Sequence, residues 1–223
     1  MIRVFIGYDQ RVASIFSVLA HSIHRRASVP VSITPLMLSQ LKHDFDRERN
    51  PKQSTDFAFS RFLVPYLSGY EGWSIFMDND MIVREDILNL LQCADDKYAV
   101  MVVKHDHKPK EKTKFLGEQQ TQYEKKNWSS VMLFNNAKCK ALSKDFVNTA
   151  SGLQLHQFKW LENDELIGEL PHKWNHLVDY DVYDPDAALV HFTSGGPYFK
   201  DYQDCDYADE WLAERDAMLF VDD

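Results

Sequence analysis

The sequence has few of the residues that build disulfide-rich or zinc-stapled scaffolds. Its three cysteines, Cys93, Cys139 and Cys205, are odd in number and lie far apart. Disulfide frameworks use even numbers of cysteines in secreted chains, and zinc sites use ligands at short, paired spacings. We therefore interpret the cysteines as thiols in a reducing compartment, and we expect a cytoplasmic protein.

Long apolar runs are also missing. No stretch approaches the roughly 20 apolar residues needed to span a bilayer. The first residues, Met1–Arg11, lack the extended apolar region of a signal peptide. We expect no transmembrane segment.

Positive charge is scarce too. The 34 Asp and Glu residues outnumber the 25 Lys and Arg residues, which gives a formal net charge of -9. A chain of this charge is a poor nucleic-acid binder, because phosphate contacts need clustered basic residues. The sequence also contains no GxGxxG, no P-loop and no GxSxG motif, so none of those three sites is predicted.

What remains is typical of a packed α/β domain. The chain has 223 residues, of which 44% are hydrophobic, and this predicts a single domain with a sizeable core. A strand over Ile2–Gly7, a helix over Arg11–Arg26 and a strand over Val31–Leu38 form a βαβ opening. Pro35 favours an edge position or a bend for that second strand.

The rest of the chain continues this alternation, with short elements separated by polar segments. We expect helices over Phe57–Tyr66, Asp86–Gln92, Ala137–Thr149 and Tyr207–Leu219, the last lying over the sheet. We expect strands over Trp73–Met77, Tyr98–Val103, Val131–Phe134 and Ala188–Phe192, with strand character resuming at Ile82 and Val83. The polar segment His105–Lys126 has no periodicity and is interpreted as a functional loop.

Two carboxylates interrupt an apolar strand region at Asp78-Asn79-Asp80. Burying two like charges is costly, and a divalent cation offsets that cost because hard cations prefer carboxylate oxygens. At the carboxyl end of a strand, the pair lies where open α/β sheets bind ligands. The alternative is an ordinary Asx turn.

His191 ends another apolar segment and precedes a loop containing Gly195 and Gly196. Neutral imidazole is a good ligand for manganese or zinc, and a glycine pair lets backbone N–H groups approach a phosphate. With Asp78 and Asp80, His191 would complete a metal site of two carboxylates and one imidazole. The alternative is a structural histidine.

Two further segments carry polar groups beside apolar ones. Arg61 lies within an aromatic helix and suits bidentate contact with phosphate, although a solvated arginine is the simpler interpretation. Asn127 and Ser129 lie just before a buried strand, where they could hydrogen-bond a ligand. The alternative is a polar strand entry with no ligand. The pairs His105/His107 and His172/His176 are interpreted as surface or substrate-loop histidines.

In their order along the chain, these features resemble a GT-A fold glycosyltransferase of glycosyltransferase family 8. The matching segments span nearly the whole chain; they are Val4–Gly7, Ser60–Tyr66, Asp78–Asp80, Asn127–Asn135, Leu170–Asn175 and His191–Thr193. The resemblance implies a doubly wound, mostly parallel sheet flanked by helices. It also implies a nucleotide-binding half in residues 1–103 and an acceptor-side half in residues 104–223.

The resemblance further implies a role for each matching residue. Asp78, Asp80 and His191 would bind a divalent cation, Mn²⁺ or Mg²⁺, that bridges the diphosphate of a nucleotide-sugar. The donor would also be bound by five residues and the two glycines of the C-terminal loop: Gly7, Tyr8, Arg61, Asn127, Ser129, Gly195 and Gly196. Glu162, Asn163 and Asp164 would face the sugar, with Asn163 standing where the family has Gln beside the anomeric carbon. The C-terminal loop is one residue shorter than in the family and lacks its phosphate-binding Lys, for which Lys200 could substitute.

The resulting hypothesis is a metal-dependent transfer of a hexose from a UDP-sugar to a hydroxyl acceptor with retention. Two alternatives stay open at this point. One is a nucleotidyltransferase on a similar sheet, and the other is a non-catalytic module that binds nucleotide-sugars.

Overall fold

The computed structural model describes residues 1–48, 53, 55–106 and 124–220. Its main sheet has six strands in the order β2-β1-β3-β6-β5-β7. In chain order these are β1 Ile2–Gly7, β2 Val31–Leu36, β3 Trp73–Met77, β5 Val100–Val102, β6 Val131–Asn135 and β7 Ile167–Glu169. Only β6 is antiparallel to its neighbours in this sheet, so the expectation of a mostly parallel sheet is confirmed. β2 lies at the edge, as Pro35 indicates.

A second, smaller sheet has the order β4-β9-β8. It contains β4 Met81–Val83, β8 His176–Leu177 and β9 Leu189–His191. Strand character does resume after Asp80, but β4 belongs to this second sheet and is not a continuation of β3. The Asp78–Asp80 segment is therefore the junction between the two sheets.

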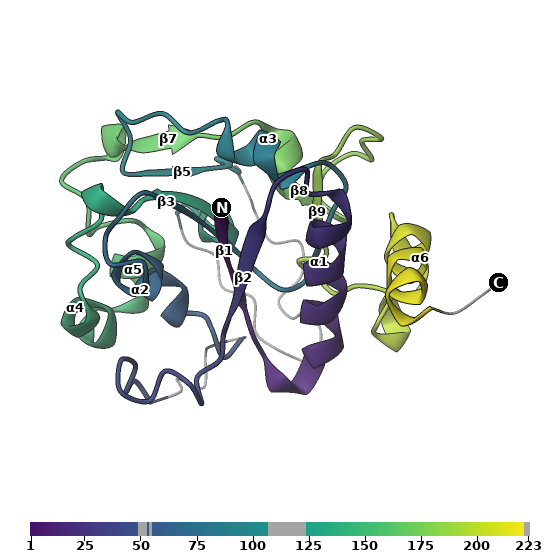
Figure 1. Ribbon diagram of the computed structural model, residues 1–223, viewed down its shortest axis with the longest axis horizontal. Coiled ribbons are helices and arrows are strands. Elements are labelled where there is room, and N and C mark those ends of the chain that lie inside the picture. The colour runs from purple at the N-terminus through teal and green to yellow at the C-terminus, as the bar shows by residue number, and fades with distance from the viewer. Residues whose placement is uncertain (49–52, 54, 107–123, 221–223) are drawn as a thin grey trace.

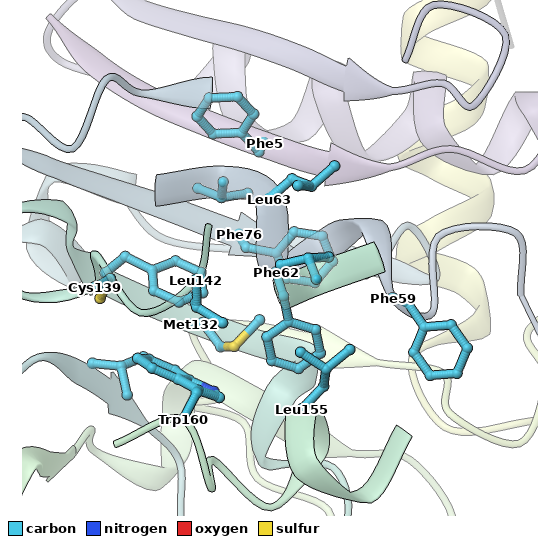
Figure 2. Close-up of a cluster of buried hydrophobic side chains, with 14 of the residues drawn as sticks. Phe5, Phe59, Phe62, Leu63, Phe76, Met132, Cys139, Leu142, Leu155 and Trp160 are labelled. Carbon is cyan, nitrogen blue, oxygen red and sulfur yellow. The ribbon is translucent and has the colours of Figure 1, made fainter. Parts of the chain in front are cut away.

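Alternate strand residues point to opposite faces of the main sheet, so both faces carry apolar side chains. Helices cover each of these faces. One face packs Phe5, Phe76 and Met132 against α2 Val64–Leu67, α4 Lys144–Thr149 and α5 Gly152–His156. Figure 2 shows this cluster, in which Phe62, Leu155 and Trp160 close over the strand side chains.

The opposite face of the sheet packs against α1 Ala13–Arg26 and α3 Ile87–Leu91. The helix α6 Ala208–Leu219 forms where the sequence predicts one, but its predicted place over the sheet is wrong. It packs on the outer side of α1 (Figure 1), and buried Glu214 pairs there with His21 at 2.6 Å and Arg26 at 2.7 Å. Arg26 is a charged partner, so α6 is held through the polar Glu214 as well as through the buried Trp211.

Two predicted helices are shorter than expected. The helix expected over Phe57–Tyr66 is a 3-10 turn, Ser60–Leu63, that continues into α2. The helix expected over Ala137–Thr149 begins only at Lys144, because the Ser143 hydroxyl accepts from the Phe146 N–H and caps it there. Most of the predicted polar loop His105–Lys126 lies outside the described residues. Among the helices that the structure describes, none is long and apolar enough to cross a membrane.

Candidate active site

Asp78, Asp80 and His191 converge at the junction of the two sheets. Asp78 follows β3 directly, Asp80 precedes β4, and His191 ends β9 opposite Met81 in the antiparallel β4–β9 ladder. The Phe192 N–H donates to the Asp80 carbonyl at 2.9 Å and ties the two segments together. One ligand-type atom from each of the three side chains lies within 4.8 Å of the others. The sequence-predicted triad is thus brought together from segments more than 100 residues apart.

Asp78 is paired with Arg61. The Arg61 Nη1 lies 2.7 Å from Asp78 Oδ1, and the side chains are only 7% and 15% exposed. The guanidinium also lies near the rings of Phe57 and Phe76, with its central carbon 5.3 and 5.0 Å from their centroids. The interpretation of Arg61 as a solvated arginine is therefore wrong: it is a buried cation directed at the carboxylate pair.

Arg61 is held in place by the segment before β6. Its Nη1 also donates to the Ser129 carbonyl at 2.8 Å. The Ser129 hydroxyl lies 2.8 Å from Nδ1 of His156, so it is engaged within the protein. Burial and then the charge of Arg61 lower the pKa of His156 to about 3, which keeps this imidazole neutral. The observed contacts of Ser129 therefore position Arg61, and the donor contact that the resemblance implies for Ser129 stays a prediction.

His191 is oriented by a chain of hydrogen bonds. Its Nδ1 lies 3.0 Å from the Asn175 Oδ1, and the Asn175 amide nitrogen donates to the Ser130 hydroxyl at 2.9 Å. Ser130 in turn donates to the carbonyl of Asn127, which adopts a left-handed conformation with φ of 65°. Because the Asn175 oxygen accepts from Nδ1, the other ring nitrogen, Nε2, faces Asp80, whose Oδ1 lies 3.3 Å away. Asn127 therefore contributes its backbone to the orientation of His191.

A partly open pocket adjoins Asp80. Its lining includes Asp9, Arg11, Asn79, Asp80 and Tyr198. Burial raises the pKa of Asp9, but the hydrogen bonds and charge of Arg11 outweigh burial and lower it overall. Burial, and then the negative charge of Asp80, raise the pKa of Tyr198 well above its ordinary value. The pocket is thus walled by an ionised Asp–Arg pair and a protonated phenol.

The other predicted donor-binding residues lie at the ends of β1 and β9. Gly7 leaves no room for a side chain, because a Cβ there would lie 2.3 Å from the Phe57 ring. The Tyr8 ring packs edge-on against Phe16. Gly195 has a φ of 140°, and a Cβ on Gly196 would lie 2.6 Å from the Tyr198 ring. The backbone conformation and packing of the C-terminal loop thus explain both glycines without a ligand. Their contact with a phosphate stays a prediction.

Glu162, Asn163 and Asp164 lie on the surface in the turn before β7. All three are exposed. The Asn163 Oδ1 accepts from the Glu165 N–H at 3.0 Å, and Asp164 pairs with Lys125 at 2.5 Å. The side-chain contacts of this turn are thus with its own backbone and with Lys125. Its proposed place beside the sugar stays a prediction.

The donor set of the cluster fits a divalent cation. Two carboxylates favour Mg²⁺ or Mn²⁺, and the imidazole favours Mn²⁺, because Mg²⁺ prefers ligands that are all oxygen. The three side chains are 15% exposed or less, so water solvates the two carboxylates poorly, and a bound cation would offset that cost.

The sequence reasoning missed four residues of this site. Asn175 and His156 act only through their neighbours; Asn175 ends the matching segment Leu170–Asn175, but the sequence assigns it no role, and no local pattern marks His156. Asp9 and Tyr198 reach the pocket through the turns that follow β1 and β9. A polar residue in an otherwise buried segment, as at Asn175, is the one signal that points to such a role.

Comparisons with known proteins agree with this geometry. A family model described as glycosyl transferase family 8 matches residues 4–151. The protein named CDI from Arabidopsis thaliana is 47% identical over 223 aligned residues, which cover 96% of this chain and 86% of CDI.

Solved structures share the fold at low sequence identity. The galactosyltransferase LgtC, solved with donor and acceptor sugar analogues, has a TM-score of 0.62 and 12% identity, covering 100% of this chain and 98% of LgtC. The bifunctional glycosyltransferase WbbM has a TM-score of 0.66 and 14% identity, over 96% of this chain. The glycosyltransferase GlyE from Streptococcus pneumoniae has a TM-score of 0.63 and 14% identity, over 98% of this chain. This chain spans only 49% of WbbM and 62% of GlyE.

The fold is that of the GT-A glycosyltransferases. The matched family model and the identity to CDI together show that this chain belongs to glycosyl transferase family 8.

Proposed function

We propose that this glycosyltransferase moves a hexose from a UDP-sugar to a hydroxyl acceptor, with retention of the anomeric configuration and with Mn²⁺ as the preferred cation. Family membership favours glycosyl transfer over the nucleotidyltransferase and the non-catalytic module. The observation that carries the proposal is the convergence of Asp78, Asp80 and His191 beside the buried guanidinium of Arg61.

Within this proposal, Asp78, Asp80 and His191 hold the cation. When bound, the cation supplies positive charge that stabilises the negative charge developing on the departing diphosphate. Arg61 adds a second, permanent positive charge next to Asp78. Asn175 keeps the Nε2 lone pair of His191 available, and the low pKa of His156 prevents a further charge next to Arg61.

We assign the donor to the region where β1 and β3 of the main sheet and β9 of the second sheet end. Gly7 and Tyr8 would lie beside the base, and Gly195 and Gly196 beside the phosphates. Glu162, Asn163 and Asp164 are proposed to face the sugar. Asp78 and Asp80 belong to residues 1–103, and His191 belongs to residues 104–223. In the proposed division into a nucleotide-binding and an acceptor-side half, the cation would therefore join the two.

The test is calorimetric titration of UDP into the wild-type protein with and without Mn²⁺, compared with the variant Asp80→Asn. We expect UDP affinity to rise with Mn²⁺ in the wild type and to be independent of Mn²⁺ in the variant. Asp95→Asn is the matched control, since Asp95 is an exposed aspartate whose partner is the exposed Lys97. The proposal fails if the wild type binds no nucleotide under either condition. The anomeric configuration of the product, read by NMR after transfer from a panel of UDP-sugars, tests retention.

A further inference from the structure

A second group of metal-type ligands lies apart from the Asp78–Asp80–His191 cluster and shares no residue with it. It consists of His105, His172 and Asp181, with one ligand-type atom from each within 4.8 Å of the others. His105 follows β5, His172 begins the 3-10 turn before β8, and Asp181 follows β8. His105 therefore meets two residues from the segments on either side of β8, more than 60 positions later in the chain.

The geometry of this group matches an imidazole-rich site. The His172 Nε2 lies 3.4 Å from the Asp181 Oδ2. Two ligand atoms of a tetrahedral zinc ion, each about 2.0–2.1 Å from the metal, are separated by roughly that distance. The His105 and His172 rings meet edge to face, with centroids 5.2 Å apart.

Two of the ligands are already fixed by the fold. The His105 side chain is only 8% exposed, and its carbonyl accepts from the Trp128 indole N–H at 2.9 Å. The Asp181 Oδ2 accepts from the Leu177 N–H at 2.6 Å. His172 is more exposed, at 54%, and leaves the site open on one side. The neighbouring His176 is not part of the group, because its Nε2 lies 3.2 Å from the Tyr207 hydroxyl.

We propose that His105, His172 and Asp181 form a second metal site, selective for a borderline transition-metal ion such as Zn²⁺. Two imidazoles and one carboxylate favour zinc over magnesium, calcium or manganese, whereas the first cluster has two carboxylates and one imidazole. The site ties the end of β5 to the 3-10 turn His172–Asn175, and Asn175 in that turn orients His191. A bound zinc ion would therefore stabilise the turn next to the active site without contacting the donor.

The test is equilibrium dialysis of metal-stripped protein against Zn²⁺, with bound metal measured by mass spectrometry. We expect the first cluster to take up Zn²⁺ as well, so Asp80→Asn isolates the second site. His172→Ala in the Asp80→Asn background should lose the remaining zinc. Asp181→Asn, which retains an acceptor for the Leu177 N–H, should weaken zinc binding by roughly 10-fold to 100-fold or more.

His24→Ala is the control, because His24 is an exposed histidine on α1 far from either cluster in sequence. In the Asp80→Asn background it should leave zinc binding unchanged. X-ray absorption of zinc bound to Asp80→Asn should show two imidazole ligands. The proposal is overturned if Asp80→Asn binds no zinc, if His172→Ala and Asp181→Asn leave its zinc affinity unchanged, or if His24→Ala lowers it equally. None of these results depends on nucleotide binding, so they are separable from a failure of the proposed transferase activity.

Discussion

Asp78-Asn79-Asp80 and Glu162-Asn163-Asp164 have the same chemical form, an amide between two carboxylates, yet the fold uses them in opposite ways. The first triplet joins two sheets, and Asn79 and Asp80 are buried. The second triplet lies in an exposed turn, where Asn163 caps a 3-10 turn and Asp164 pairs with Lys125. The same types of side chain therefore differ in the free-energy cost of keeping their charges in the folded protein.

The difference comes from the surrounding backbone. Strand pairing on both sides of Asp78–Asp80 fixes its two carboxylates beside Arg61 and His191. The turn at Glu162–Asp164 is exposed, so water can solvate its carboxylates. Losing the Lys125 partner of Asp164 would therefore cost little free energy of unfolding. The first triplet should therefore be sensitive to each of its partners, and the second should tolerate change. Four experiments test this contrast, from the largest expected effect to the smallest.

Removing the buried cation should cause the largest loss. We expect Arg61→Ala to lower the free energy of unfolding by about 3–5 kcal/mol, because it leaves the buried Asp78 carboxylate unpaired. Arg25→Ala removes an exposed arginine 3.6 Å from Glu214 and should cost less than about 1 kcal/mol. Urea unfolding measures both. Equal losses in the two variants would show that the first triplet is no more sensitive than the surface.

Removing the residue that orients His191 should weaken the cation site without removing a ligand. Asn175→Ala should lower Mn²⁺ affinity by roughly 10-fold to 100-fold, as is typical for partners that orient a metal-bound imidazole. Asn89→Ala is the control, since Asn89 is an exposed residue of α3 and contacts only Glu85 through its side chain among the described contacts. Calorimetric Mn²⁺ titration is the measurement. An unchanged affinity in Asn175→Ala would mean that the strands alone orient His191.

The neutral His156 should make stability depend on pH. Its pKa is lowered from 6.5 to about 3 by burial and by Arg61, so below pH 6.5 the unfolded state binds a proton that the folded state does not. Stability from this group is complete above that pH and falls as the pH drops towards 3. Relative to His156→Gln, the wild type should lose about 1.4 kcal/mol between roughly pH 7.5 and pH 5.5. Urea unfolding at both pH values gives this difference. A wild type that loses no more stability than the variant would contradict the neutral state of His156.

The smallest stability change is expected in the exposed triplet. Asn163→Ala should cost about 1 kcal/mol or less, similar to Ser151→Ala, which removes the cap of α5. If Asn163 also faces the sugar, turnover should fall by about tenfold or more in Asn163→Ala and not in Ser151→Ala, since one lost transition-state hydrogen bond is worth about 1.4 kcal/mol. Chemical unfolding and steady-state kinetics separate the two effects. Equal turnover in both variants would leave the second triplet with a structural role only.

Much of the fold was predictable from local patterns. The strands β1, β3, β5 and β6 coincide with apolar runs, and α1 follows its helical periodicity. The errors lie where a single side chain or a distant partner decides the outcome. Ser143 shortens the helix that ends at Thr149, and the ion pairs of Glu214 draw α6 onto α1 and away from the sheet.

The sequence by itself determined the chemistry of the candidate site. It predicted Asp78, Asp80 and His191 as ligands, because charged residues inside apolar segments are costly unless they are paired. It assigned Arg61 a donor-binding role through the family resemblance. The tertiary structure alone decided which groups serve those four residues: Ser129 and His156 behind Arg61, and Asn175 with Ser130 behind His191. It also brought His105, His172 and Asp181 together. The physical reason is that a local pattern shows which polar or charged side chain would be costly to bury. The side chain that pairs with it, and so lowers that free-energy cost, is determined by strand order and loop closure across the whole chain.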